Sequence, residues 1–287
     1  MLKALIESQP EISYIEARTR LMAEANPKNT DVAAAISSTR NKLKNRLAAL
    51  NNSYHNEEHC EEVADRTKKF LDNLANPDLF TDREKKLLVE TAIRHDDEHA
   101  GKNYRQLVPN VQGAGMSNEE WSALLAIDDL KDELKQEDME FIESHILATT
   151  FGQGAALIEK TFPNSLELQE KLKRQYSPKT TSERLLALAD VGAFRNGYDK
   201  WLKISFNLVK EQGNIPENID VWIKNNESFV LLYLKPLLES IKDTFKPEFY
   251  LKLTKELQDI MDGLQSLKTI DSPQRADYIN KLEALKK

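Results

Sequence analysis

Helix-breaking residues are scarce in this chain, and they gather in a few short segments. Only 9 Gly and 10 Pro occur among 287 residues, and the runs between them are rich in Leu, Glu, Lys and Ala, which favour helix. Apolar residues recur there at helical spacing, as in Leu43, Leu47 and Leu50. No alternating, strand-like pattern competes with this periodicity. The sequence therefore predicts an all-α fold, a compact multi-helix bundle.

The candidate functional residues all lie in the middle of the chain. We expect residues 1–45 to form an N-terminal helical cap, residues 46–246 a functional domain, and residues 247–287 C-terminal helices packed on that domain. Two helix starts in the central part have the pattern of a capping box, Thr81 with Glu84 and Ser117 with Glu120.

Composition excludes several classes of protein. The formal net charge is −7 and no basic stripe is visible, so we expect no nucleic-acid partner. Cys60 is the single cysteine, which excludes an internal disulfide and fits a reducing compartment. The N-terminus reaches Glu7 after a short apolar stretch, and no run approaches 18 apolar residues. We therefore expect no signal peptide, no membrane span and a cytoplasmic protein; the oligomeric state is open.

Four of the five histidines form two pairs with four-residue spacing, His55 with His59 and His95 with His99. On a helix such residues share a face, so each pair can converge on one point. A single pair is most often structural or incidental. Two pairs that use nearly every histidine of the chain favour a metal site. The fifth histidine, His145, precedes an apolar run and is interpreted as a core residue, with metal ligation as the alternative.

Two carboxylates extend this pattern. Asp96 directly follows His95, and Asp190 ends the apolar run that begins at Leu185. A buried carboxylate needs a partner or a metal ion, whereas the alternative for Asp190 is a helix end that faces solvent. Imidazole with carboxylate suits zinc, manganese or iron, and carboxylate with water suits magnesium. Beside the histidines, we favour the metal-binding interpretation.

With these motifs the chain resembles the HD superfamily of metal-dependent phosphohydrolases and, within it, the catalytic domain of class I cyclic nucleotide phosphodiesterases. The resemblance covers about residues 50–245 and follows the family's order. The matching motifs are Tyr54-His55-Asn56 with His59 and Val63, Phe80-Thr81-Asp82 with Glu84, His95-Asp96 with His99, Gly101 and Asn103, Leu147-Ala148-Thr149, Ala189-Asp190, Trp201 with Gln212-Gly213, and Phe229 with Pro236-Leu237. The chain departs from the family at Thr150, which stands in place of Asp, and at Asn226, which stands in place of a purine-reading Gln.

The resemblance implies two divalent metal ions. It assigns the first ion, Zn²⁺, Fe²⁺ or Mn²⁺, to His59, His95, Asp96 and Asp190. Asp96 would be shared with a second ion, Mg²⁺ or Mn²⁺. Such a pair of ions can activate water and hold the phosphoryl oxygens for in-line attack.

The same resemblance assigns roles around the metals. His55 would be the general acid, with His99 and Glu119 orienting it or the attacking water; Glu120 is the alternative to Glu119. Phe229 and Asn226 would contact the base of a small-molecule nucleotide. Without the resemblance, Phe229 would be interpreted as a core aromatic and Glu119 as the N-terminal acid of a helix.

Three functions fit this sequence. The leading hypothesis is a phosphodiesterase that acts on a 3′,5′-cyclic nucleotide or a related nucleotide. A nucleotide phosphomonoesterase with the same metals is the alternative, because Asn118-Glu119 with Ser122-Ala123 resembles a segment of smaller bacterial HD proteins. The third is a non-catalytic nucleotide sensor, which the complete set of metal ligands argues against.

Overall fold

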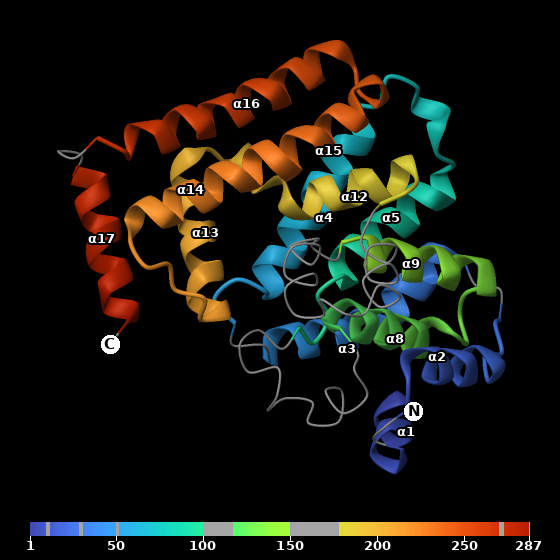
Figure 1. Cartoon of the computed structure of the whole chain (residues 1–287). Coiled ribbons are helices and arrows are strands. Elements are labelled where there is room, and N and C mark those ends of the chain that lie inside the picture. Colours follow the sequence, from blue (N-terminus) through green and yellow to red (C-terminus); the bar gives the residue numbers. More distant parts are fainter. Residues whose placement is uncertain are drawn as a thin grey trace, which may run out of the picture.

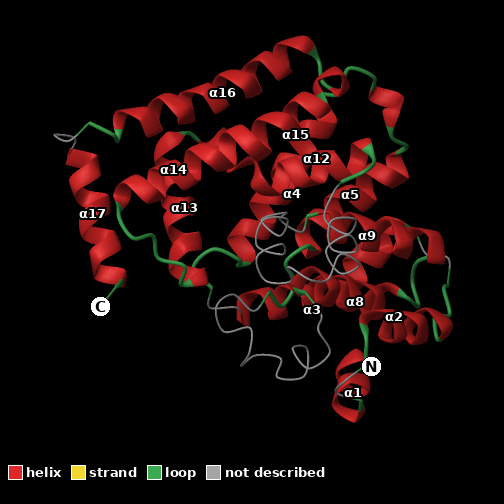
Figure 2. Ribbon diagram, in the orientation of Figure 1, coloured by secondary structure: helices red, strands yellow, loops and turns green. Residues whose placement is uncertain are grey.

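The computed structural model describes residues 1–9, 12–28, 31–49, 52–99, 117–149, 178–269 and 273–286. Throughout these ranges the chain folds into helices joined by short loops, with no strand (Figure 1, Figure 2). The only extended pairing among them is an isolated antiparallel bridge between Leu74 and Phe245. The prediction of an all-α fold is confirmed. Gly101, Asn103 and Thr150 of the family motifs lie outside the described residues.

The helices follow the chain in a simple order. Their bounds are α1 Leu2–Ser8, α2 Tyr14–Ala23, α3 Val32–Ala49, α4 Glu57–Asp72, α5 Asp82–Arg94, α8 Asn118–Leu130, α9 Gln136–Ala148, α12 Thr181–Val191, α13 Tyr198–Gln212, α14 Ile219–Phe229, α15 Lys235–Ser240, α16 Pro247–Ser266 and α17 Pro273–Leu285. Short 3-10 turns span Pro77–Leu79, Gly192–Asn196 and Lys242–Thr244, and a π-helical turn spans Val230–Leu234.

The two predicted capping boxes are present. At the start of α5 the Glu84 amide donates to Oγ1 of Thr81 at 3.2 Å, and the Glu84 carboxylate accepts from the Thr81 amide at 2.7 Å. Ser117 and Glu120 exchange the same two bonds at the start of α8. Each box satisfies amides that would otherwise lack a partner at a helix start, so local sequence fixes where α5 and α8 begin.

Two hydrophobic clusters form the core. The smaller cluster joins α1, α2 and the start of α3 to α8 and α9. The larger cluster joins α4, α5 and α12 to the C-terminal helices α13 to α17, and it includes the fully buried Phe70, Phe194 and Trp222. Figure 1 shows α4, α5 and α12 in the middle of the molecule, with α15 and α16 above them and α14 to their left. The start of α4 and the ends of α5 and α12 are thereby anchored from both sides. The division of the chain at residues 45 and 246 stays a prediction.

Helix α14 continues into α15 through the π-helical turn. Pro236 lies in the first turn of α15, and its missing N–H and bulky ring interrupt the α-helical bonding of the residues before it. A wider π turn accommodates this break, and Phe229 ends α14 just before the turn. The local distortion therefore lies next to a predicted substrate-contacting residue.

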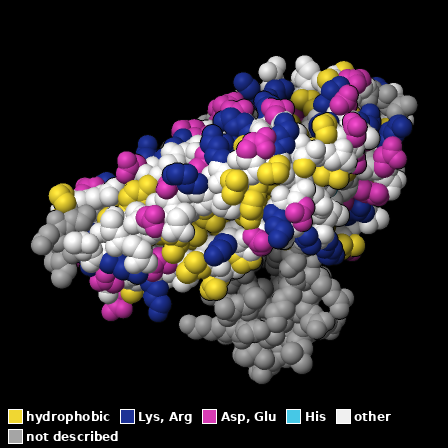
Figure 3. Space-filling model, turned by 90° about the horizontal axis from the view of Figure 1, so that it is seen from above, with side chains coloured by type: hydrophobic (Ala, Val, Ile, Leu, Met, Phe, Trp, Pro, Cys, Tyr) yellow, Lys and Arg dark blue, Asp and Glu magenta, His cyan; other side chains and the backbone are white. Residues whose placement is uncertain are grey.

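The surface is mixed in character. Seen from above, charges of both signs are interspersed with a band of apolar side chains (Figure 3). Among the described residues, no helix is long and apolar enough to cross a membrane.

Candidate metal centre and substrate pocket

His95 and Asp96 stand at the end of α5. His95 caps the helix, and its Nδ1–H donates to the Ala92 carbonyl at 2.8 Å. A carbonyl can only accept, so in the neutral ring this bond fixes the tautomer and places the lone pair on Nε2. Nε2 of His95 lies 3.0 Å from Oδ2 of Asp96 and 3.3 Å from Oδ1 of Asp190. The atom of His95 that can bind a metal is thus aimed at both predicted carboxylates.

His59 reaches the same point from the first turn of α4. Asn56 caps this helix by accepting from the His59 amide at 3.1 Å. Nε2 of His59 lies 3.2 Å from Oδ1 of Asp190, 3.3 Å from Oδ2 of Asp96 and 3.3 Å from Nε2 of His95. Two imidazoles and two carboxylates therefore surround one point, as the ligand assignment requires.

The charges in this cluster are strongly coupled. Burial raises the pKa of Asp96 and Asp190, but the histidine charges, that of His95 foremost, together with hydrogen bonds from His59 and His95 hold both values well below the ordinary range. Burial lowers the pKa of His95, and the two carboxylates more than reverse this effect. Each carboxylate thus stays ionised only because positive charge lies beside it, and a cation can supply that charge.

Arg66 binds the backbone at the end of α12, where Asp190 lies. Asp190 lies in the last turn of α12, where carbonyls lack helical partners. The buried Arg66 of α4 donates from Nε to the Ala189 carbonyl at 2.5 Å and from Nη2 to the Asp190 carbonyl at 3.3 Å. The guanidinium therefore closes the end of α12 and holds the backbone that carries Asp190.

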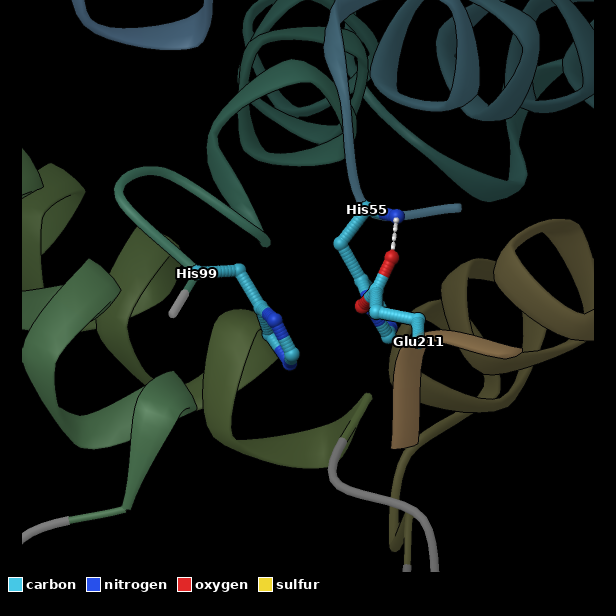
Figure 4. Close-up of side chains that lie close together, drawn as sticks. All are labelled: His55, His99 and Glu211. Atoms are coloured by element: carbon cyan, nitrogen blue, oxygen red, sulfur yellow. Dashed lines mark hydrogen bonds and ion pairs between the residues drawn. The ribbon is translucent and has the colours of Figure 1, made fainter. Parts of the chain in front are cut away.

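A second cluster lies beside the first and consists of His55, His99 and Glu211. Figure 4 shows these side chains converging from the segment before α4, the turn after α5 and the end of α13. Glu211 contacts Nδ1 of His55 with one oxygen, and with the other it accepts from the amides of Tyr54 and His55 at 2.7 and 3.1 Å. The His99 ring stacks on the His55 ring, with centroids 3.6 Å apart and planes 19° apart. Nε2 of His55 lies 4.0 Å from Oδ2 of Asp96.

The two stacked rings differ in their affinity for a proton. Burial lowers the pKa of His55, but Asp96 and Glu211 raise it above the ordinary value. Burial and the neighbouring His55 charge lower the pKa of His99 to about 3. His55 is therefore the ring that carries a proton, while His99 stays neutral and stacks against it.

The two histidines of each pair do not lie on one helix. His55 lies before the N-cap of α4, so it is not on the helix that carries His59. His99 lies past the end of α5, and Glu98 between the two histidines has a positive φ of 56°. The rings instead meet across the pairs. His59 lies with His95 in the candidate metal cluster, and His55 lies with His99 in the second cluster.

A pocket of about 280 Å³ opens beside both clusters. It brings together most of the predicted site residues, namely His55, Asp96, His99, Glu119, Asp190, Asn226 and Phe229. His59 and His95 are buried at the metal cluster and do not line it. Burial raises the pKa of the Glu119 carboxyl, whereas Glu120 is engaged in the capping box of α8. The predicted metal ligands and the predicted base-contacting residues thus belong to one connected site.

The far end of the pocket is aromatic and amide-lined. The Phe229 ring lies 5.9 Å from Trp201 and 5.6 Å from Tyr233, the latter stacked at 23°. Nδ2 of the buried Asn226 donates to the Trp222 carbonyl at 2.9 Å. This bond fixes the orientation of the amide, because a carbonyl accepts only from the NH₂ end.

Two other residues considered from sequence have structural surroundings. His145 is buried, stacks on Phe141 and lies 2.8 Å from Oγ of Ser182, outside both histidine clusters. Cys60 is fully buried beside His95 and Asp96, and burial raises the pKa of its thiol well above the ordinary value. A thiol kept protonated in this way is a poor nucleophile.

Sequence reasoning missed Glu211. One signal was available, because an acid in the last turn of a helix is disfavoured by the helix dipole. Glu211 is the penultimate residue of α13, and Gly213 follows in the left-handed conformation that ends the helix. An acid kept in such a position indicates a specific partner, although the sequence does not say that the partner is His55.

Comparison with known proteins identifies the fold. No family model and no curated protein matches the sequence. Among solved structures, the chain is similar to the phosphodiesterase domain of the RhoPDE fusion protein from the choanoflagellate Salpingoeca rosetta. That match has a TM-score of 0.55 at 16% identity and covers 96% of this chain and 100% of the other. A second structure of the Salpingoeca rosetta rhodopsin phosphodiesterase domain matches with a TM-score of 0.52 at 16% identity, over 98% and 97% of the two chains.

LmjPDEB1, solved in complex with IBMX, matches with a TM-score of 0.53 at 16% identity, over 90% of this chain and 92% of the other. All three similarities extend over nearly the whole of both chains. The chain therefore has the fold of phosphodiesterase domains.

Proposed function

We propose that this protein is a metal-dependent phosphodiesterase that acts on a 3′,5′-cyclic nucleotide or a related nucleotide. One observation carries the proposal: a cluster of two imidazoles and two carboxylates lies beside a carboxylate-held histidine, and both open on one pocket. The phosphodiesterase fold of the solved structures supports the same assignment.

The residues present fit a metal ion. The candidate ligand atoms of His59, His95, Asp96 and Asp190 lie 3.0 to 3.3 Å apart in the contacts between imidazole and carboxylate. Ligands about 2.1 Å from one ion are separated by about 3 Å, so the cluster has the size of a metal site. Zn²⁺, Fe²⁺ or Mn²⁺ suits this mixed donor set, and Asp96 would be shared with a second ion, Mg²⁺ or Mn²⁺. Bound ions would supply Lewis acidity to the phosphoryl group and acidify the attacking water.

His55 would supply the proton. Its Nδ1 is engaged by Glu211 and its Nε2 lies 4.0 Å from Asp96 at the pocket wall. A protonated Nε2 there can transfer its proton to the departing ester oxygen as the bond to phosphorus breaks. Neutral His99 stacks on the ring and holds its plane without competing for the proton. Glu119, which also lines the pocket, would orient the attacking water.

The far end of the pocket would hold the base. Phe229 offers a ring face for stacking, and the ring already lies against Trp201 and Tyr233. One hydrogen of the Asn226 NH₂ group is donated to the Trp222 carbonyl, and the Oδ1 atom, which this bond does not use, can accept from the base edge. Asn226 would therefore recognise a hydrogen-bond donor, such as an exocyclic amine.

Hydrolysis of bis(p-nitrophenyl) phosphate and of p-nitrophenyl phosphate with added Mn²⁺ tests this proposal. We expect turnover of the diester that is lost in Asp190→Ala and retained in Asp65→Ala, which removes an exposed carboxylate of α4 (side chain 65% exposed). Cyclic nucleotides would then be compared as substrates. Turnover of the monoester alone would indicate the phosphomonoesterase, and bound metal without turnover of any phosphate ester would indicate the sensor.

A further inference from the structure

The two residues that flank the His95-Asp96 pair in sequence are both buried and charged. Arg94 and Asp97 have fully buried side chains, and neither faces the candidate metal cluster. Both are instead connected to Asp129 of α8, Arg94 directly and Asp97 through a third side chain. Nη1 of Arg94 donates to Oδ2 of Asp129 at 3.0 Å, and Asp97 is joined to Asp129 by a single guanidinium, that of Arg46.

The Arg46 guanidinium donates hydrogen bonds to both acids, Asp97 and Asp129. Its Nε donates to both oxygens of Asp97, at 2.9 and 3.1 Å, and its Nη2 donates to Oδ2 of Asp129 at 2.6 Å. The Arg46 side chain is 16% exposed, and those of Asp97 and Asp129 are 0% and 6% exposed. Charged hydrogen bonds with so little access to water are strong and geometrically specific.

Further charged side chains belong to this network, including Lys42, which lies 3.6 Å from Asp129. Arg94 is also paired with Glu90, and Glu90 with Arg40 of α3 at 3.5 Å. Removal of one cation would leave a buried carboxylate without its counter-ion, which is far more costly than the absence of the whole pair. Loss of Arg46 would therefore leave the buried Asp97 without the guanidinium that ties it to α8.

The turn beyond Asp96 lacks regular helical support. Glu98 has a φ of 56°, a left-handed conformation that is unfavourable for a residue with a side chain. Glu98 is itself held by Lys3 of α1 at 2.8 Å and by Trp121 at 3.2 Å. The peptide that presents His95 and Asp96 thus passes from a helix directly into a strained turn, and side-chain contacts hold that turn in place.

We infer that Arg46 is a positioning residue for the metal centre: by tying Asp97 to Asp129, it fixes the backbone from which His95 and Asp96 reach the metal ions. Arg46 lies in the last turn of α3, ahead of the residues that carry the phosphodiesterase-like motifs. The inference gives α3, most of which belongs to the expected N-terminal cap, a task in positioning the metal ligands, and it rests on the proposed metal centre.

The affinity of the metal-free protein for Mn²⁺, measured by titration calorimetry, tests the inference. For Arg46→Gln we expect the Kd for Mn²⁺ to rise about 10- to 100-fold, the usual effect of losing a group that orients metal ligands. Arg46→Lys keeps the charge but lacks the planar fork, so its Kd should fall between those of the wild type and Arg46→Gln.

Arg18→Gln is the matched control. Arg18 of α2 donates from Nε to Glu143 of α9 at 2.5 Å, so this variant also breaks an arginine–carboxylate pair between an N-terminal helix and the functional domain. Both glutamine variants should unfold at lower temperature, but Arg18→Gln should keep the wild-type Kd for Mn²⁺. A purely structural role of Arg46 would give both variants the same unchanged Kd.

The outcomes separate the two proposals. A wild type that binds no Mn²⁺ would overturn the metal centre and the inference with it. If the wild type binds Mn²⁺ and folded Arg46→Gln and Arg46→Lys bind it with the same Kd as the wild type, the inference alone would be overturned. If Arg46→Gln does not fold, Arg46→Lys and Asp129→Asn give the same comparison with smaller perturbations, and wild-type affinity in both would overturn the role of Arg46.

Discussion

Glu211 holds both the backbone and the ring of His55. One carboxylate oxygen accepts from the amides of Tyr54 and His55, and the other contacts Nδ1 of the imidazole. The ring is therefore fixed in orientation and only Nε2 remains, facing Asp96 and the pocket. In the proposed mechanism this arrangement leaves a single atom from which a proton can reach the leaving group.

The proton affinity of His55 depends on this contact. Burial lowers the pKa of His55, and Asp96 and Glu211 raise it above the ordinary value. Since the proposed general acid must be protonated, activity should fall as the pH rises through that pKa. In Glu211→Gln the pKa drops, so the basic limb of the kcat/KM profile should move to lower pH. The control is Glu58→Gln, an exposed acid of α4 (side chain 80% exposed), and an unchanged profile in Glu211→Gln would contradict this role.

Metal binding should stabilise the fold through Asp190. A ligand that binds only the native state stabilises it by about 2.7 kcal/mol at 100 times its Kd. We expect Mn²⁺ added after EDTA treatment to raise the Tm of the wild type. Asp190→Asn removes the carboxylate that contacts both metal-cluster histidines, so most of that rise should disappear. Thermal unfolding with and without Mn²⁺ measures it, and an equal rise in both proteins would argue against the site.

Arg66 should contribute to stability as well as to the site. Arg66→Met leaves the carbonyls of Ala189 and Asp190 without their donor. A buried polar group that loses its partner costs about 1–3 kcal/mol, so we expect a decrease of that size in the free energy of unfolding, measured in urea. Lys68→Met on the same helix removes an exposed pair with Asp65 (side chains 57% and 65% exposed) and should change it by less than about 0.5 kcal/mol. If both substitutions lowered the free energy of unfolding by the same amount, the bonds from Arg66 to the end of α12 would contribute no more than an exposed ion pair.

Phe229 should act on substrate binding and not on the chemical step. Stacking of a base on an aromatic side chain contributes about 1–3 kcal/mol, so Phe229→Ala should raise KM about tenfold or more with a smaller change in kcat. Leu232→Ala, three residues further on and 78% exposed, is the control and should leave both constants unchanged. Steady-state kinetics on the best nucleotide substrate measures the difference. A fall in kcat at constant KM would place Phe229 outside the base site.

Local sequence predicted the helices well because their signals are local. The capping boxes at Thr81 and Ser117 depend on residues three positions apart, and both are present. The pairing of the histidines did not follow from spacing, because it requires continuous helix. Helix α4 begins only after its N-cap Asn56, so His55 precedes the helix, and α5 ends at Arg94, so His99 lies beyond the turn in which Glu98 has a positive φ.

The residues that sequence reasoning missed act over long distances in the chain. Glu211 lies 156 residues from His55, and Arg46 lies 51 residues from Asp97. Nothing in their own neighbourhoods reveals these partners, since glutamate and arginine are ordinary on a helix surface. Their burial, which sequence does not report, is what makes them informative.

Because the histidines pair across the two segments, each segment sets the distance between the second cluster and the candidate metal cluster. The segment from His55 to His59 places one ring in the second cluster and one in the candidate metal cluster, and the segment from His95 to His99 does the same. In the proposed enzyme, the separation between proton donor and metal therefore depends on two four-residue spacings, His55 to His59 and His95 to His99. Both spacings must be compatible with the same separation. An insertion in either segment would leave all four histidines present and yet pull the two halves of the chemistry apart.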